Sequence, residues 1–73
     1  GRVEALEFKI TKGSPIVGIP LMELNLKRDI LIGCINRKGT IIIPKGQSVI
    51  EEGDTVIVVT TKSGLSDIKD ILG

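Results

Sequence analysis

Few residues in this chain of 73 have side chains that could carry out covalent chemistry. Cys34 is the single cysteine, and the sequence has no histidine that could act as a base to activate its thiol. Most general acid–base catalysts also use histidine or tyrosine, and both are missing. Without histidines or a cysteine pair, the usual ligands of zinc are missing too. We therefore predict that the chain is not an enzyme and holds no transition metal or other cofactor.

Three carboxylates stand close together at Glu51, Glu52 and Asp54. Such a group could attract a divalent cation, but carboxylates on a solvated turn more often bind no metal. Asp54 follows Gly53, where an aspartate side chain usually accepts hydrogen bonds from its own turn. We interpret the group as a turn, and cation binding is the alternative.

Basic residues offer a second kind of chemistry, which is contact with an anion. Lys45 lies between Pro44 and Gly46, so its ammonium group and an open backbone N–H could face a phosphate together. The same residues could simply turn a corner. Arg37 and Lys38 are interpreted as a solvated hairpin turn, with an anion contact as the alternative.

Charge and hydropathy exclude further classes of protein. Ten basic and nine acidic residues are interspersed and give a net charge of +1, so no basic stripe for a phosphate backbone is present. No apolar run approaches the roughly 18 residues of a membrane span, and residues 1–8 do not resemble a signal peptide. A single cysteine indicates a reducing compartment. We expect one domain over residues 1–73, from a larger cytoplasmic protein.

The elements that must position these residues are mostly strands, because the chain contains thirteen isoleucines and six valines. Alternating apolar and polar residues predict a half-exposed strand over residues 3–10. Runs that are apolar on both faces predict strands over 30–37, 40–43 and 55–61, and residues 49–50 could add a short pairing segment. Gly39 predicts a tight hairpin between the second and third strands, and Gly33 predicts either a bulge within the second strand or the close approach of another backbone.

Two helices complete the expected fold. Pro20 suits the first position of a short helix, in which Leu21 and Leu24 would share one face. Apolar residues at helical spacing over residues 65–72 predict a C-terminal helix capped by a serine. The predicted fold class is α+β: a small, mainly antiparallel β-sheet with one short helix after the first strand and one helix at the C-terminus.

Two of the predicted strands carry apolar side chains on both faces, at residues 30–35 and 56–59. The two helices can cover one face of the sheet, but the other face would form an apolar patch larger than soluble monomers usually expose. We therefore predict a homodimer that buries this second face and forms a cleft at its interface. Residues 27–29 would rim that cleft or form a solvated loop.

Five short blocks occur in order along essentially the whole chain: Val3–Phe8, Gly18–Leu26, Leu31–Gly39, Ile43–Gly46 and Gly53–Asp54. With these blocks the chain resembles the TrkA C-terminal domain, also called the RCK C-terminal domain. The resemblance implies a cytosolic regulatory module of potassium channels and transporters, which forms dimers and in some members binds small effectors such as cyclic di-AMP. It further implies a preceding nucleotide-binding, Rossmann-like domain and a membrane potassium transporter as partner, which would hold the protein at the inner membrane.

The resemblance also implies a ligand site in the dimer cleft. The effector contacts of the family correspond here to Arg28, Leu31, Ile32 and Pro44, and Lys45 would join them at the rim. Leu31 is apolar where a hydrogen-bonding side chain would help to hold a nucleobase or a phosphate, which argues against cyclic di-AMP. No Gly-x-Gly-x-x-Gly occurs, so nicotinamide or ATP binding is not assigned to this domain.

The segment from Gly39 to Val56 is also similar to the swapped-hairpin DNA-binding domains of the AbrB type. Three departures count against that alternative: residues 44–53 are too few for the helix of that family, no arginine follows Pro44 there, and a long ordered segment precedes the hairpin. DNA binding also needs clustered cations. We therefore expect no nucleic acid partner.

Overall fold

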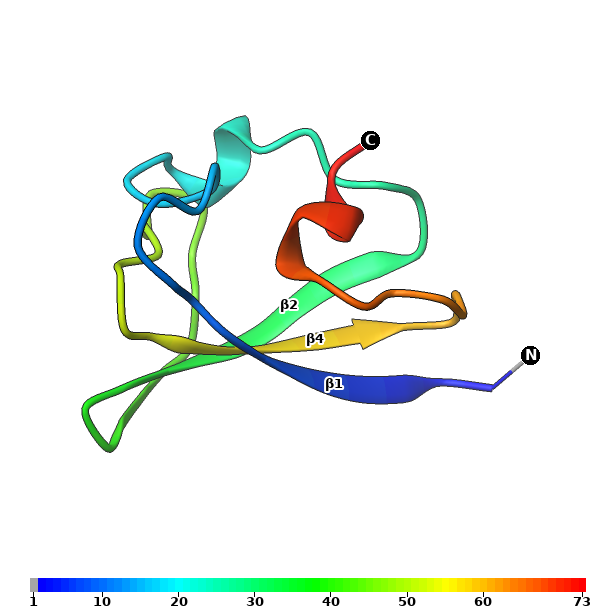
Figure 1. Cartoon of the computed structure of the whole chain (residues 1–73), viewed down its shortest axis with the longest axis horizontal. Helices are drawn as coiled ribbons and strands as arrows, with labels where there is room; N and C mark the ends of the chain where they lie inside the picture. The colour runs from blue at the N-terminus through cyan, green and yellow to red at the C-terminus, as the bar shows by residue number, and fades with distance from the viewer. Residues whose placement is uncertain (1) are drawn as a thin grey trace.

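The computed structural model describes residues 2–73, which form a single four-stranded sheet with the turns and long connections on one side of it (Figure 1). The strands are β1 (Glu4–Lys9), β2 (Ile30–Arg37), β3 (Thr40–Ile42) and β4 (Thr55–Thr60). Their order in the sheet is β1-β4-β2-β3, and every pair is antiparallel. The two strands that are richest in apolar residues, β2 and β4, therefore lie at the centre of the sheet. The predicted antiparallel sheet is confirmed.

The predicted helices, in contrast, are wrong. The structure has only two short 3-10 turns, η1 (Leu21–Glu23) and η2 (Ile68–Ile71). The reason is that the chain after each turn forms tertiary hydrogen bonds instead of helical ones. The N–H of Lys27 donates to the carbonyl of Ile71 at 2.7 Å, and the N–H of Gly73 donates to the carbonyl of Asn25 at 2.7 Å. The two turns thus end by pairing with each other, and the fold is a mainly-β domain rather than α+β.

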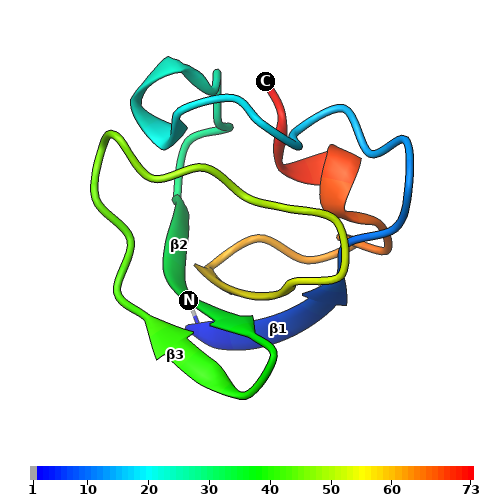
Figure 2. The ribbon, with the colours of Figure 1, turned by 90° about the vertical axis from the view of Figure 1, so that its left-hand side faces the viewer.

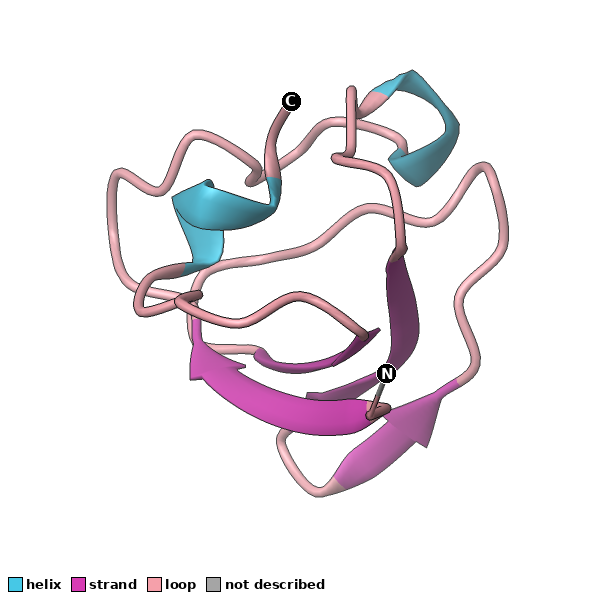
Figure 3. Ribbon diagram, turned by 90° about the vertical axis from the view of Figure 1, so that its right-hand side faces the viewer, coloured by secondary structure: helices cyan, strands magenta, loops and turns pink. Residues whose placement is uncertain are grey.

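Both turns and the long connections lie on the same side of the sheet, as Figure 3 shows by the separation of helical turns from strands. This side forms the core. Its cluster of buried apolar residues comes from the strands, the connections and η2: Ile10, Ile16, Ile32, Ile35, Ile50, Val56, Val58, Ile68 and Ile71. Isoleucine dominates because β-branched side chains pack well on a pleated surface.

Turn chemistry sets the register of the sheet. Lys38 and Gly39 both have positive φ, of 52° and 85°, which is the backbone of a two-residue type I′ hairpin between β2 and β3. The register between β2 and β4 shifts from Ile32 to Cys34, so the bulge predicted at Gly33 is confirmed. Ile50 pairs with Val17 in an isolated parallel bridge, which is the short pairing segment predicted at residues 49–50.

The opposite side of the sheet, called here the outer face, is apolar at its centre. Val59 lies between Ala5 and Leu31 in the register, and Ile57 lies beside Cys34. In Figure 1 the turns and long connections lie above the sheet, and none crosses the outer face below β1, β4 and β2. No helix among residues 2–73 has the length and apolar character that a membrane crossing would need.

Candidate functional site

Four of the five predicted site residues line one cavity, of about 250 Å³, between η1 and the start of β2. We call it the β2–β3 cavity. Leu31, Ile32, Pro44 and Lys45 belong to it, and the remaining lining residues are Leu21, Met22, Leu26 and Gly46. Arg28 does not line the cavity, so the structure does not bring it together with the other four. Its place in the exposed connection before β2 explains this.

Pro44 and Lys45 are positioned by a tight corner after β3. Pro44 has no N–H to continue the ladder of β3, so the strand ends before it. The backbone N–H of Lys45 donates to Ser48 Oγ at 2.9 Å, and the N–H of Ser48 donates back to the carbonyl of Lys45 at 3.0 Å. This reciprocal pair of hydrogen bonds closes the corner and holds the backbone of Lys45 in place.

The 3-10 turn η1 forms the second wall of the cavity, and two backbone hydrogen bonds hold it there. The N–H of Met22 donates to the carbonyl of Gly46 at 2.9 Å, and the N–H of Leu21 donates to the carbonyl of Ser48 at 2.9 Å. Figure 2 shows the connection from β3 to β4 rising beside η1. A Cβ added at Gly46 would lie 3.4 Å from Met22 Cβ, so the two segments pack in van der Waals contact here.

The lining of the cavity is almost entirely apolar. Apart from the Lys45 ammonium, its side chains are hydrocarbon or thioether, and no nucleophile or carboxylate is among them. Leu31 and Met22 are 63% and 67% exposed, whereas Ile32 is only 7% exposed because it faces the core. Sequence reasoning missed Leu21, Met22, Leu26 and Gly46 at this cavity. The hydrogen bonds that join η1 to residues 46–48 link backbone groups far apart in the sequence, so no local pattern predicts them.

A second polar cluster joins the end of β2 to the turn before β4. Arg37 Nε donates to Asp54 Oδ1 at 3.0 Å, and Arg37 Nη2 donates to Asp54 Oδ2 at 2.9 Å. Nη2 also donates to the carbonyl of Val49, and Nη1 lies 3.3 Å from Glu51 Oε2. The interpretation of Arg37 as part of a solvated turn is therefore wrong. A hairpin arginine gives no sequence signal of a partner 17 positions away.

The same cluster explains the carboxylates at the turn. The backbone N–H of Glu51 donates to Asp54 Oδ2 at 2.9 Å, which confirms that Asp54 caps its own turn. The hydrogen bond from Arg37 is the main cause of a lowered pKa for Asp54, and burial opposes it. Two of the three carboxylates are thus engaged by Arg37. Within residues 2–73 no group of three or more possible metal-ligating side chains has the geometry of a metal site.

The chain is thus a small mainly-β domain with an apolar outer face and a cavity at the rim of its sheet. The family model of the TrkA-C domain matches residues 5–73. The chain belongs to the TrkA-C domain family.

Curated relatives agree with this assignment. The chain is 34% identical to the "Trk system potassium uptake protein TrkA homolog" of Pyrococcus abyssi over 70 residues, which are 94% of this chain and 31% of that protein. It is also 34% identical to the protein of the same name from Archaeoglobus fulgidus over 73 residues, all of this chain and 17% of that protein. The chain thus spans about a third or less of the length of these relatives.

Proposed function

We propose that this chain is a cytoplasmic regulatory domain of a potassium uptake system, in which two copies pair and a small effector binds between them. Membership of the TrkA-C family and the potassium uptake proteins among its relatives support the regulatory role and the potassium system. By the same reasoning, a nucleotide-binding domain and a membrane potassium transporter would be its partners in the parent protein. That transporter would hold it at the inner membrane.

One observation carries the proposal for the effector site. Leu31 belongs both to the outer face of the sheet, where it pairs with Val59, and to the lining of the β2–β3 cavity. A second copy that packs on the outer face would therefore also close the cavity. Leu31, Ile41 and Ile43 are 63%, 58% and 71% exposed, and burial of such side chains stabilises a complex by about 25 cal/mol per Å² of apolar area.

The chemistry of the lining restricts the effector. Hydrocarbon walls with one ammonium group suit a largely apolar or aromatic molecule that carries a single negative charge near Lys45. A two-fold interface would present Lys45 from each copy, and the effector could then be symmetric. Leu31 offers no hydrogen bond to a phosphate or base, so cyclic di-AMP remains the weaker candidate.

A thermal-shift screen tests the effector proposal directly. The purified chain would be heated with cyclic di-AMP, ATP, ADP or a divalent cation, because a ligand that binds only the folded state raises the melting temperature. We expect a saturable rise with one anionic effector, reduced in Lys45→Gln and kept in Lys38→Gln. Lys38 is an exposed lysine of the hairpin and does not line the cavity.

Two results would count against the proposal. The first is a rise that is the same in the Lys45→Gln and Lys38→Gln variants, since the β2–β3 cavity would then not be the site. The second is salt-sensitive binding of duplex DNA in the micromolar range or tighter, which would favour the swapped-hairpin alternative.

A further inference from the structure

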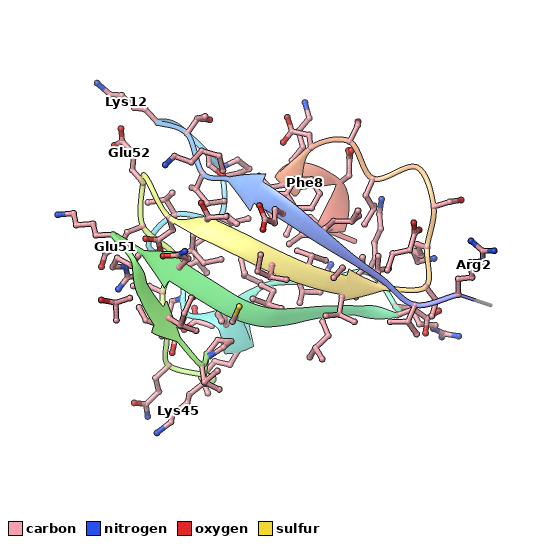
Figure 4. All side chains as sticks on the ribbon, turned by 90° about the horizontal axis from the view of Figure 1, so that it is seen from below. Arg2, Phe8, Lys12, Lys45, Glu51 and Glu52 are labelled. Carbon is pink, nitrogen blue, oxygen red and sulfur yellow. The ribbon has the colours of Figure 1, made fainter. Side chains whose placement is uncertain are left out.

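A second cavity, of about 410 Å³, lies at the free edge of β1, and we call it the β1-edge cavity. Its walls are the turn at residues 11–15 and the segment at residues 66–69, and it shares no lining residue with the β2–β3 cavity. Phe8 lies at this edge and Lys45 at the β3 side of the molecule (Figure 4). The volume falls within the range of about 300–1,000 Å³ that small-molecule sites occupy.

The β1-edge cavity is lined by three lysines that form no ion pair among the described residues. Lys9, Lys12 and Lys69 line it, and none of these ammonium groups has a carboxylate within 4.0 Å among residues 2–73. The carboxylates in the lining are Glu7 and Asp67. Asp67 Oδ1 already accepts the N–H of Lys69 at 3.1 Å, as the cap of η2. A third carboxylate, that of Asp70, lies behind the wall, where its Oδ2 accepts the N–H groups of Ser66 and Asp67 at 3.0 Å.

Hydrogen-bond donors add to these charges. Ser14 lines the cavity, and its Oγ is buried without a hydrogen-bond partner among the described residues, an arrangement that is unfavourable unless something else accepts the bond. The N–H of Ile10 donates to the carbonyl of Asp54 at 2.8 Å, on the side of β4. Because successive N–H groups of a strand alternate in direction, the N–H of Lys9 points off the free edge of β1.

We propose that the β1-edge cavity binds a phosphate group, either as free phosphate or as a small phosphate monoester. The three lysines that line the cavity come from β1, from the turn after it and from the segment after β4, so positive charge is contributed by three separate segments of the chain. A phosphate has several strong acceptor oxygens and can accept bonds from these groups and from the Ser14 hydroxyl together, and bonds between charged groups are the stronger kind. A carboxylate offers only two oxygens for the same donors.

The test is a titration of the isotope-labelled chain followed by amide chemical shifts, with inorganic phosphate in one arm and glycerol 3-phosphate in the other. Sodium chloride keeps the ionic strength constant. We expect saturable shifts at Gly13, Ser14 and Lys69, with a dissociation constant in the millimolar range. Tighter binding of glycerol 3-phosphate would identify a monoester as the ligand, and equal binding would identify free phosphate. Both results support the site.

Two variants and a matched control locate the site. Lys12→Gln/Lys69→Gln should weaken phosphate binding about fivefold or more, and the exposed Lys38→Gln should leave it unchanged. Ser14→Ala should also weaken binding while the melting temperature stays the same or rises, which a purely structural role of Ser14 would not produce. Shifts that fail to saturate, that appear equally with chloride, or that weaken equally in Lys38→Gln would mean an adventitious ion only and would overturn the proposal.

Discussion

Arg37 and Asp54 form a two-bond ion pair that closes the end of the domain where β2, β3 and β4 meet. The guanidinium of Arg37 spans both carboxylate oxygens of Asp54 and also reaches the carbonyl of Val49. Asp54 is 1% exposed, and its carboxylate has no other cationic partner within 4.0 Å among residues 2–73. A planar guanidinium fits a carboxylate in this way, whereas a lysine could not make the same paired bonds.

The first prediction concerns the strength of this pair. Asp54→Ala should lower the free energy of unfolding by about 2–3 kcal/mol, because the guanidinium of Arg37 and the N–H of Glu51 lose their acceptor. Glu51→Gln is the control: the Glu51 side chain is 57% exposed, so its loss should change the same quantity by less than about 1 kcal/mol. Urea unfolding of both variants measures the difference. Equal losses would show that the Arg37–Asp54 pair stabilises the fold no more than the exposed contact between Arg37 and Glu51.

The second prediction is the acid dependence of stability. The hydrogen bond from Arg37 holds the pKa of Asp54 below its ordinary value, and the backbone hydrogen bonds from Ser66 and Asp67 do the same for the pKa of Asp70. A lowered folded-state pKa adds stability above the unfolded pKa of about 3.9, and this stability is lost as the pH falls through the folded value.

The melting temperature should therefore be nearly flat from about pH 5 to 8 and fall below about pH 4. Asp54→Asn should have a lower melting temperature at neutral pH and a shallower fall in acid. A fall that is just as steep in Asp54→Asn would assign the acid sensitivity to other carboxylates.

Most of the sheet could be predicted because its signals are local. The alternation over β1, the glycine of the hairpin and the bulge at Gly33 each depend on a few neighbouring residues, and all are present in the structure. The helices could not be predicted correctly, because the decisive contacts join residues 25–27 to residues 71–73. Apolar spacing at Leu21 and Ile68 is compatible with one turn or with several. The long-range pairing then limits each to one turn.

The candidate site, like the fold, could be predicted only in part. Leu31, Ile32 and Pro44 could be placed together because the resemblance to a family supplied a relationship across strands, and Lys45 was predicted beside them at the rim of the cleft. Arg28 lies outside the β2–β3 cavity, and the sequence could not show this because the length of a loop does not determine where its side chains point. The partnership of Arg37 and Asp54 could not be predicted, since charge alone does not show which of nine acidic residues an arginine will meet.

The third prediction concerns the hairpin between β2 and β3. Gly39 has φ of 85°, and nothing lies within 4 Å of a Cβ built there, so Gly39→Ala tests backbone strain without a steric clash. We expect a loss of about 1 kcal/mol in the free energy of unfolding. Lys38→Gly is the matched control, because Lys38 also has positive φ and glycine relieves its strain. If Gly39→Ala left the free energy of unfolding unchanged, the hairpin would not need a glycine at the positive φ of residue 39.

The last prediction separates the two faces of β2 with neighbouring residues. Leu31 is 63% exposed on the outer face, and Ile32 is 7% exposed in the core. Leu31→Asp should turn a dimer into a monomer and leave the melting temperature of that monomer close to that of a dissociated wild-type chain. Ile32→Asp should lower the free energy of unfolding by about 3 kcal/mol or more, because a carboxylate would be buried without a partner.

Sedimentation velocity at tens of micromolar measures the mass of each variant, and circular dichroism measures its folding. Comparing the two variants is informative because both replace a branched apolar residue by aspartate, at neighbouring positions on opposite faces of the strand. A wild-type chain that sediments as a well-folded monomer would contradict the dimer. It would also contradict the effector site between two copies, because the exposed Leu31 would then have no second chain to cover it.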